Sequence, residues 1–121
     1  MSTYALTHYA KPWTMNFQRG TASRWKVAAL TDEWRGVFHL LALEQHIPRL
    51  TRVTIVVDHQ TRTRQLPDTC AIAPAYKAAL DGIVDAGILP DDGPEYVHAV
   101  TFLPAHRTGR DALTLTLTEV A

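Results

Sequence analysis

The residues from Lys77 to Asp92, KAALDGIVDAGILPDD, combine types and spacing that suit chemistry on a phosphate. Lys77 and Asp81 are four residues apart, and the run ends in the adjacent carboxylates Asp91 and Asp92. Adjacent carboxylates repel each other and need a countercharge. A divalent cation such as Mg²⁺ or Mn²⁺ supplies one while it keeps open positions for phosphate and water. The run therefore predicts a cation site beside a lysine.

Two structural interpretations stay open for the same residues. A lysine and an aspartate four residues apart on a helix form an ordinary solvated ion pair, which contributes roughly 0.2 to 0.5 kcal/mol. Asp91, Asp92 and Gly93 also form a typical turn sequence. The local pattern does not decide between a functional site and a structural role.

An amphipathic helix is predicted to position Lys77 and Asp81. Apolar residues recur at steps of three and four, and the charged residues occupy a neighbouring face. Pro74 suits the first turn of this helix, and Gly87 suits the residue just past its last turn. Pro90 opposes helical continuation, so the paired carboxylates are expected on a loop.

The remaining pattern predicts one α+β domain, residues 1–121, with a mixed sheet of about four strands packed with two main helices. A second helix is expected from an N-cap at Thr31 to about His46, with Trp34 on its apolar stripe. The last strand alternates leucine and threonine, which predicts leucines inward and threonines outward. The expected strands are Ser2–Leu6, Val53–Asp58, Tyr96–Leu103 and Ala112–Val120. The polar segment 11–20 is expected to be irregular, and the segment 60–65 is expected to be a loop or hairpin connection.

Charge is unevenly distributed along a chain whose formal net charge is zero. The segment from His46 to Leu66 contains four arginines against a single acid, Asp58, whereas the segment from Pro67 to Glu95 contains six acids against Lys77 alone. A metal-dependent enzyme acting on a polyanion needs this polarity, because acids hold the cation and arginines hold phosphates.

Other features exclude several kinds of site. The lone Cys70 excludes an intramolecular disulfide and favours a reducing compartment, and a buried or half-buried thiol is expected. The six histidines lack zinc-ligand spacing, and no phosphate-binding glycine motif is present. With neither a signal peptide nor a membrane span predicted, a cytoplasmic protein is expected.

A second group of candidates lies near the N-terminus. Trp13 and Trp25 are the aromatic residues expected to be available for stacking on bases, with core packing as the alternative. The basic residues near them in sequence are Lys11, Arg19, Arg24 and Lys26.

The run KAALDGIVDAGILPDD, with the arginine loop before it, resembles the RusA family of Holliday junction resolvases, which are common in bacteriophages and prophages. The opening MSTYALTHYAKPWTMN is similar to the family's N-terminal strand and its loop with Pro and Asn, and TGRDALTLTLTEV is similar to its closing strand. The resemblance covers nearly the whole chain. It implies a homodimeric endonuclease that cuts four-way DNA junctions with Mg²⁺ or Mn²⁺, in the bacterial host cytoplasm if the chain is phage-encoded.

Carried over residue by residue, the resemblance implies a role for each matched position. Asp92 matches the metal-binding second Asp of the pair, and Lys77 matches the essential lysine. The implied catalytic residues are Lys77, Asp68, Asp81 and Asp92. The implied metal ligands are Asp68, Asp91 and Asp92. The expected DNA-binding residues are Arg62 and Arg64, joined by Arg19, Arg24 and Lys26.

The chain departs from the family in an Asp-x-Asp-Asn motif that normally precedes the lysine. Leu66 stands for its first Asp and Thr69 for its Asn, while Asp68 stands for its second Asp. A missing carboxylate predicts weaker metal binding. Three outcomes follow: a slower nuclease, recruitment of Asp58 or Asp91 as a substitute ligand, or junction binding without cutting.

Overall fold

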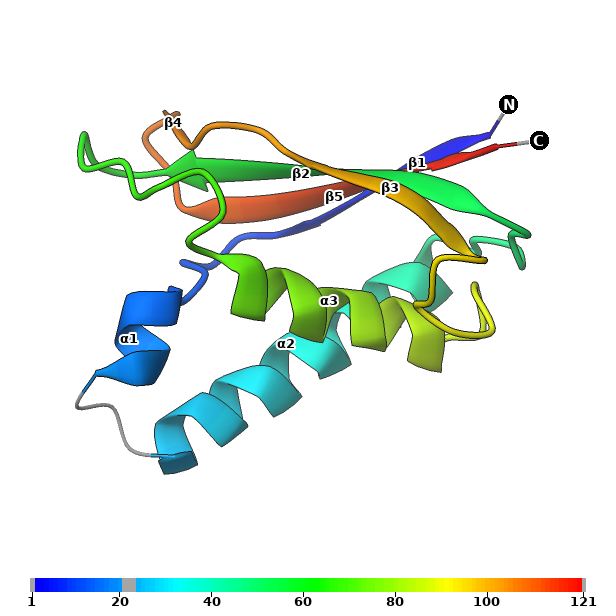
Figure 1. The fold of residues 1–121 in the computed structure, drawn as a ribbon, viewed down its shortest axis with the longest axis horizontal. Helices are drawn as coiled ribbons and strands as arrows, with labels where there is room; N and C mark the ends of the chain where they lie inside the picture. The colour runs from blue at the N-terminus through cyan, green and yellow to red at the C-terminus, as the bar shows by residue number, and fades with distance from the viewer. Residues whose placement is uncertain (1, 21–23, 121) are drawn as a thin grey trace.

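Helices α2 and α3 lie side by side against one face of a mixed sheet (Figure 1). The computed structural model describes residues 2–20 and 24–120. Over these residues the elements are β1 (Thr3–His8), α1 (Met15–Arg19), α2 (Arg24–Glu44), β2 (Val53–Thr61), α3 (Ala73–Asp85), β3 (Val97–Phe102), β4 (His106–Arg107) and β5 (Ala112–Glu119). This arrangement confirms the predicted α+β fold.

The sheet is mixed because β2 pairs antiparallel with β5 on one side and parallel with β3 on the other. The strand order is β1-β5-β2-β3, and the short β4 also pairs with β2. Parallel neighbours require a long crossover. Here the crossover from β2 to β3 contains α3, so the predicted Lys77 helix is mounted directly on the sheet.

Alternation along the strands directs apolar side chains toward the helices. Leu113, Leu115 and Leu117 of β5 are fully buried, and the threonines between them are partly exposed, as predicted. Helix α2 contributes Trp34 and Phe38, both fully buried, at a four-residue step. The core therefore lies between one sheet face and the two long helices.

Helix α2 begins at Arg24, so the predicted N-cap at Thr31 is wrong. Thr31 lies inside the helix, where its hydroxyl donates to the carbonyl oxygen of Val27 at 2.8 Å. The residues before Thr31, RWKVAAL, include good helix formers that continue the helix upstream. Although α2 has 21 residues, neither it nor any other described helix is long and apolar enough to cross a membrane.

Smaller differences from the predicted elements occur in the polar segments. Residues 15–19 form α1, capped by the Thr14 hydroxyl, instead of an irregular arm. Strand β2 continues to Thr61 because β4 and β5 give its last residues partners. Cys70 is exposed, which contradicts the expected buried thiol, because it lies in the turns before α3 and not on its apolar face.

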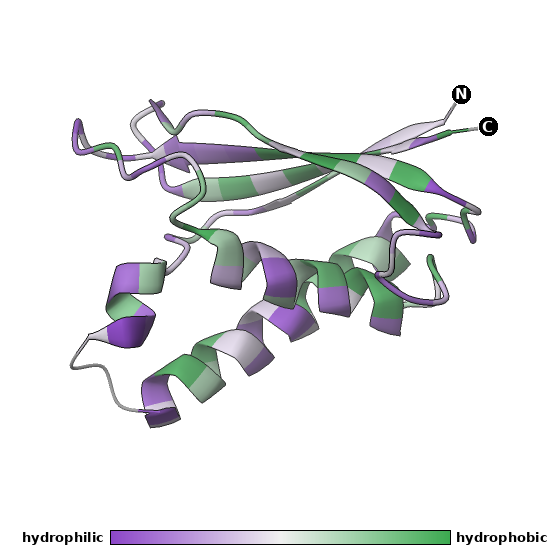
Figure 2. Cartoon of the chain, in the orientation of Figure 1, coloured by the Kyte–Doolittle hydropathy of each residue, from purple (hydrophilic) through white to green (hydrophobic). Residues whose placement is uncertain are grey.

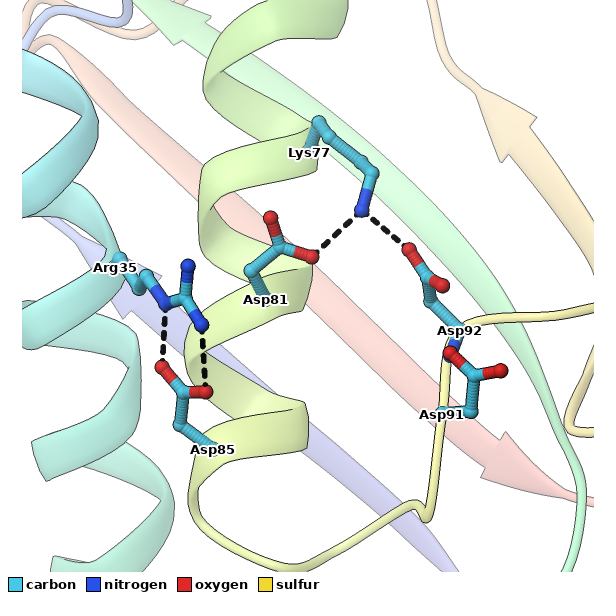
Figure 3. Close-up of polar contacts among 6 residues, drawn as sticks. All are labelled: Arg35, Lys77, Asp81, Asp85, Asp91 and Asp92. Atoms are coloured by element: carbon cyan, nitrogen blue, oxygen red, sulfur yellow. Dashed lines mark hydrogen bonds and ion pairs between the residues drawn. The ribbon is translucent and has the colours of Figure 1, made fainter. Parts of the chain in front are cut away.

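Helices α2 and α3 approach each other closely at Gly82. A Cβ atom at this position would lie 2.2 Å from the Arg35 carbonyl oxygen and 3.0 Å from the His39 backbone nitrogen. Real Cβ contacts are longer, so only glycine permits this spacing. The close crossing places Arg35 of α2 beside the acidic face of α3 (Figure 3).

Candidate functional site

Lys77, Asp81 and Asp92 form one cluster on the exposed side of α3 (Figure 3). The Lys77 ammonium donates to Asp81 Oδ1 at 2.6 Å and also to Asp92 Oδ2. Lys77 and Asp81 lie one helical turn apart, whereas Asp92 arrives from the loop after the helix. Three of the predicted site residues are therefore in contact.

The loop after α3 folds back along the helix and so brings Asp92 to Lys77. Gly87 has a φ of +83°, a left-handed conformation that ends the helix at the predicted position. Ile88 and Leu89 are then each 1 % exposed, and Leu50 N–H donates to the Ile88 carbonyl oxygen at 2.8 Å. The polar residues that follow are thus carried by an anchored loop.

Asp91 is next to the cluster but outside it. Its Oδ1 atom accepts from the backbone N–H of Asp92 at 2.7 Å, and its side chain points away from Lys77 (Figure 3). This hydrogen bond fixes the turn that presents Asp92. Asp91 therefore has the turn role that was left open from the sequence.

The electrostatics of the cluster follow from the shared ammonium. Burial opposes the charge on Lys77, but its hydrogen bonds to Asp81 and Asp92 outweigh burial and raise its pKa above the ordinary value. The hydrogen bond from Lys77 lowers the pKa of Asp92. Burial, with the two carboxylates, raises the pKa of the neighbouring Tyr76 hydroxyl to about 12. The lysine and Asp92 are therefore both charged at neutral pH.

A second ion pair lies beside the Lys77 cluster. Together they form a charged row along α3, which consists of Lys77, Asp81, Asp85, Asp92 and Arg35. Arg35 donates to both carboxylate oxygens of Asp85, at 2.5 and 2.8 Å (Figure 3). This bidentate pairing lowers the pKa of Asp85, chiefly through the hydrogen bond from Arg35. The pair links α2 to α3 and leaves Asp85 unavailable as a free ligand.

The side chains around Asp92 do not fit a tightly held divalent cation. Within residues 2–20 and 24–120, no three His, Cys, Asp or Glu side chains are grouped closely enough to hold a metal ion. The Lys77 ammonium occupies the space between the carboxylates of Asp81 and Asp92. One helical turn before Lys77 the residue is Ala73, so α3 offers no further carboxylate on that side. Binding of Mg²⁺ or Mn²⁺ stays a prediction.

Asp68 is not part of the cluster. It lies in the turn before α3, where its carbonyl oxygen accepts from Ala71 N–H at 2.9 Å, and its carboxylate makes no hydrogen bond or ion pair with any described residue. The proposed substitute Asp58 is paired with His106 at 2.9 Å. Neither carboxylate contacts Asp92.

Basic side chains gather at one end of the sheet, where β2 ends and β5 begins. Strand pairing causes this, because Gln60 lies opposite both His106 and Ala112, and Thr61 lies opposite Arg107. Figure 2 shows that this end of β2 and the loop after it are mainly hydrophilic. We call this group the basic end; its exposed members are Lys11, Arg62, Arg64, Arg107 and Arg110.

Acids in the basic end are already engaged. Asp111 Oδ1 accepts from the Arg62 backbone N–H at 2.9 Å, and Asp58 is paired with His106. The Arg110 guanidinium lies 3.9 Å from the centre of the Tyr9 ring. None of the four arginines of the basic end forms an ion pair with a described residue, so their charges are available to an external anion.

Sequence reasoning predicted Arg62 and Arg64 but missed Arg107 and Arg110 as parts of the same surface. The signal available was the T-G-R turn before the closing strand, which predicts a connection at a sheet end. It does not predict which other loop lies there. That information comes from the pairing of β2 with β4 and β5.

The N-terminal candidates divide between core and surface. Trp13 is only 6 % exposed, and its ring packs edge-on against Trp34 at 5.8 Å, so it is a packing residue. Trp25 is 85 % exposed. Arg19 ends α1, and Arg24 and Lys26 lie in the first turn of α2. Arg24 lies roughly 16 Å along α2 from Arg35, the α2 residue that pairs with Asp85, so it is outside the charged contacts of α3.

No protein-family model matches the sequence, and no curated protein matches it.

Proposed function

We propose that the protein binds branched DNA, with the four-way junction as its preferred form, through the basic end. The observation that carries this proposal is the gathering of exposed basic side chains from three separate loops and from strand β4 at one sheet end. Contacts between Lys or Arg and phosphates supply most of the sequence-independent affinity of DNA-binding proteins. A neutral chain that gathers five of its twelve Lys and Arg residues at one sheet end suits this mode of binding.

The resemblance to junction resolvases supports the branched form of the DNA. A homodimer presents two basic ends related by a two-fold axis, and a four-way junction presents pairs of equivalent arms. The dimer, the host cytoplasm as location and the preference for junctions all belong to this proposal.

Binding is proposed to need no divalent cation. The Lys77 ammonium already neutralises part of the charge on Asp81 and Asp92, so the acidic cluster is stable without one. The cluster still holds one cation against two carboxylates, so in this cation-free mode it is assigned no phosphate contact. The basic end is the part of the surface assigned to the DNA phosphates.

The test is a binding competition in EDTA. A labelled four-way junction is titrated with protein in the presence of excess linear duplex of the same sequence, and anisotropy reports the bound fraction. We expect the junction to stay bound. Equal competition by the duplex would contradict junction preference, and absence of binding to either DNA would contradict the whole proposal.

The second candidate is the metal-dependent junction endonuclease itself. It is favoured by one observation, the convergence of Lys77 and Asp92 from α3 and from the loop that follows it. Its test is cleavage of a four-way junction with Mg²⁺ or Mn²⁺, compared with flaps and linear duplex. Cleavage that Asp92→Asn and Lys77→Ala abolish would establish this candidate. Cleavage at full rate in either variant would place the chemistry elsewhere.

A further inference from the structure

A pocket opens under the basic end, on the side of the sheet that faces the helices. Its volume is about 330 Å³, at the low end of the range for small-ligand sites. The segment that contains Lys11 and Pro12 forms one wall, and the loop after β2, from Arg62 to Pro67, forms the other. The last residues of β2, His59 and Thr61, therefore face this pocket instead of the hydrophobic core.

Among the described residues, two buried polar side chains line the pocket, His59 and Thr61, and Thr61 already has hydrogen-bond partners. The His59 side chain is on the helix-facing side of β2, is 5 % exposed, and makes no hydrogen bond with any residue that the structure describes. Buried polar side chains normally have partners. Burial lowers the pKa of His59, while Asp111 and Asp58 partly oppose this shift. The neutral ring therefore retains unused hydrogen-bonding capacity in the pocket.

Two cations lie at the mouth of the pocket. The side chains of Lys11 and Arg62 both line it, and neither forms an ion pair with a described residue. The described lining also contains one carboxylate, that of Asp111, which accepts from the Arg62 backbone N–H, so the two cations exceed the acid by one charge. Thr63 and Gln65 add polar groups to the same wall. An anion with several oxygen atoms, such as a phosphate, matches this set.

The lining also includes apolar side chains, against which a flat group can pack. Pro12 lies on one wall and Leu66 on the other, and Leu66 is 53 % exposed although it is large and apolar. Exposed leucines are common singly, but this one borders a polar pocket and gives it an apolar face. A phosphate joined to a planar base would use both parts of the lining, whereas inorganic phosphate would use only one.

We propose that this pocket binds a single nucleotide, with its phosphate between Lys11 and Arg62, a hydrogen bond to His59, and its base between Pro12 and Leu66. The proposal rests on the proposed function only for the source of the nucleotide. If the protein binds DNA, the nucleotide in the pocket is one unpaired nucleotide of the bound strand. The same chemistry recognises a free nucleoside monophosphate.

The experiment is an NMR titration that follows the ring resonances of His59 in the full chain. The probes are deoxythymidine monophosphate, inorganic phosphate, thymidine and a short single-stranded oligonucleotide. We expect saturable shifts with the monophosphate and the oligonucleotide, together with a rise in the pKa of His59, because a bound phosphate favours the imidazolium. Equal affinity for inorganic phosphate, or no shift at millimolar monophosphate, would overturn the proposal.

Variants separate the two halves of the pocket. Lys11→Ala and Arg62→Ala, both at exposed positions, should weaken monophosphate binding about tenfold each, because each removes a charged hydrogen bond. Leu66→Ser should weaken binding of the monophosphate but not of inorganic phosphate. Arg49→Ala, an exposed arginine before β2, is the control and should change neither affinity. Unchanged affinity in both Lys11→Ala and Arg62→Ala would contradict the site.

The outcome is distinguishable from that of the proposed function. Junction binding in EDTA without any response of His59 would reject the pocket while branched-DNA binding stands. A response of His59 to the monophosphate without junction binding would support the pocket and reject the function.

Discussion

Lys77 is the residue on which the acidic face of α3 depends. Its ammonium is shared by Asp81 and Asp92, so it holds the loop after α3 against the helix as well as balancing charge. The cluster is partly exposed, with 55 % of the Lys77 side chain accessible, and exposed ion pairs contribute little to stability. Its importance is therefore local order and charge placement more than free energy of unfolding.

The stabilising effect of this contact is predicted to depend on pH. The folded-state pKa of Asp92 is lowered from 3.8 by Lys77, so the contribution is present above that value and is lost as pH falls below it. We expect Asp92→Asn to reduce the free energy of unfolding at neutral pH by up to about 1 kcal/mol. Denaturant titrations across the acid range should show the difference from wild type closing well below 3.8.

Asp91→Asn is the matched control for this measurement. Asparagine keeps an Oδ1 acceptor for the Asp92 N–H, and Asp91 does not contact Lys77. This variant should keep the wild-type stability at neutral pH. A loss equal to that of Asp92→Asn, or a difference that persists at the lowest pH, would show that the pairing with Lys77 is not its cause.

At the scale of elements, the crossing of α2 and α3 determines how the charged row is assembled. The helices meet at Gly82, and the crossing sets Arg35 against Asp85. The loop that returns from Gly87 then adds Asp92 to the same face. The site thus combines two helices and a loop, and a change at the crossing is transmitted to it without touching a charged group.

Gly82→Ala tests this dependence. The added methyl group would meet the Arg35 carbonyl, so we expect a loss of about 1–3 kcal/mol in the free energy of unfolding. Gly36→Ala in α2 is the control, because a Cβ there meets nothing within 4 Å and helix propensity predicts a gain of roughly 0.5–1 kcal/mol. Thermal denaturation of both variants measures the contrast. Equal effects would contradict the close-crossing explanation.

The elements differ in how well the sequence predicted them. Helix α3 and strand β5 were predicted because periodicity, Pro74 and Gly87 all indicate the same boundaries. The start of α2 was not, since Thr31 followed by two acids is typical of a helix N-terminus. Lys77 and Asp92 are 15 residues apart, and their contact depends on how the loop after α3 folds back along the helix. Spacing in the sequence does not define that path.

At the scale of the whole molecule, a net charge of zero conceals two separated regions. The acids of α3 and its following loop form one, and the basic end forms the other. Sequence order gave this polarity in part, because arginines precede acids along the chain. The inclusion of Arg107 and Arg110 required the pairing of distant strands. The central claim is that this assembled basic end binds the phosphates of a DNA junction.

The most direct test of that claim is the salt dependence of junction binding in EDTA. Each phosphate contact contributes about 0.9 to the slope of log affinity against log salt concentration. We predict that the double variant Arg62→Ala, Arg107→Ala lowers the slope by about 1.8, two such contacts, while Arg49→Ala leaves it unchanged. An unchanged slope in the double variant, or an equal drop in Arg49→Ala, would contradict the account.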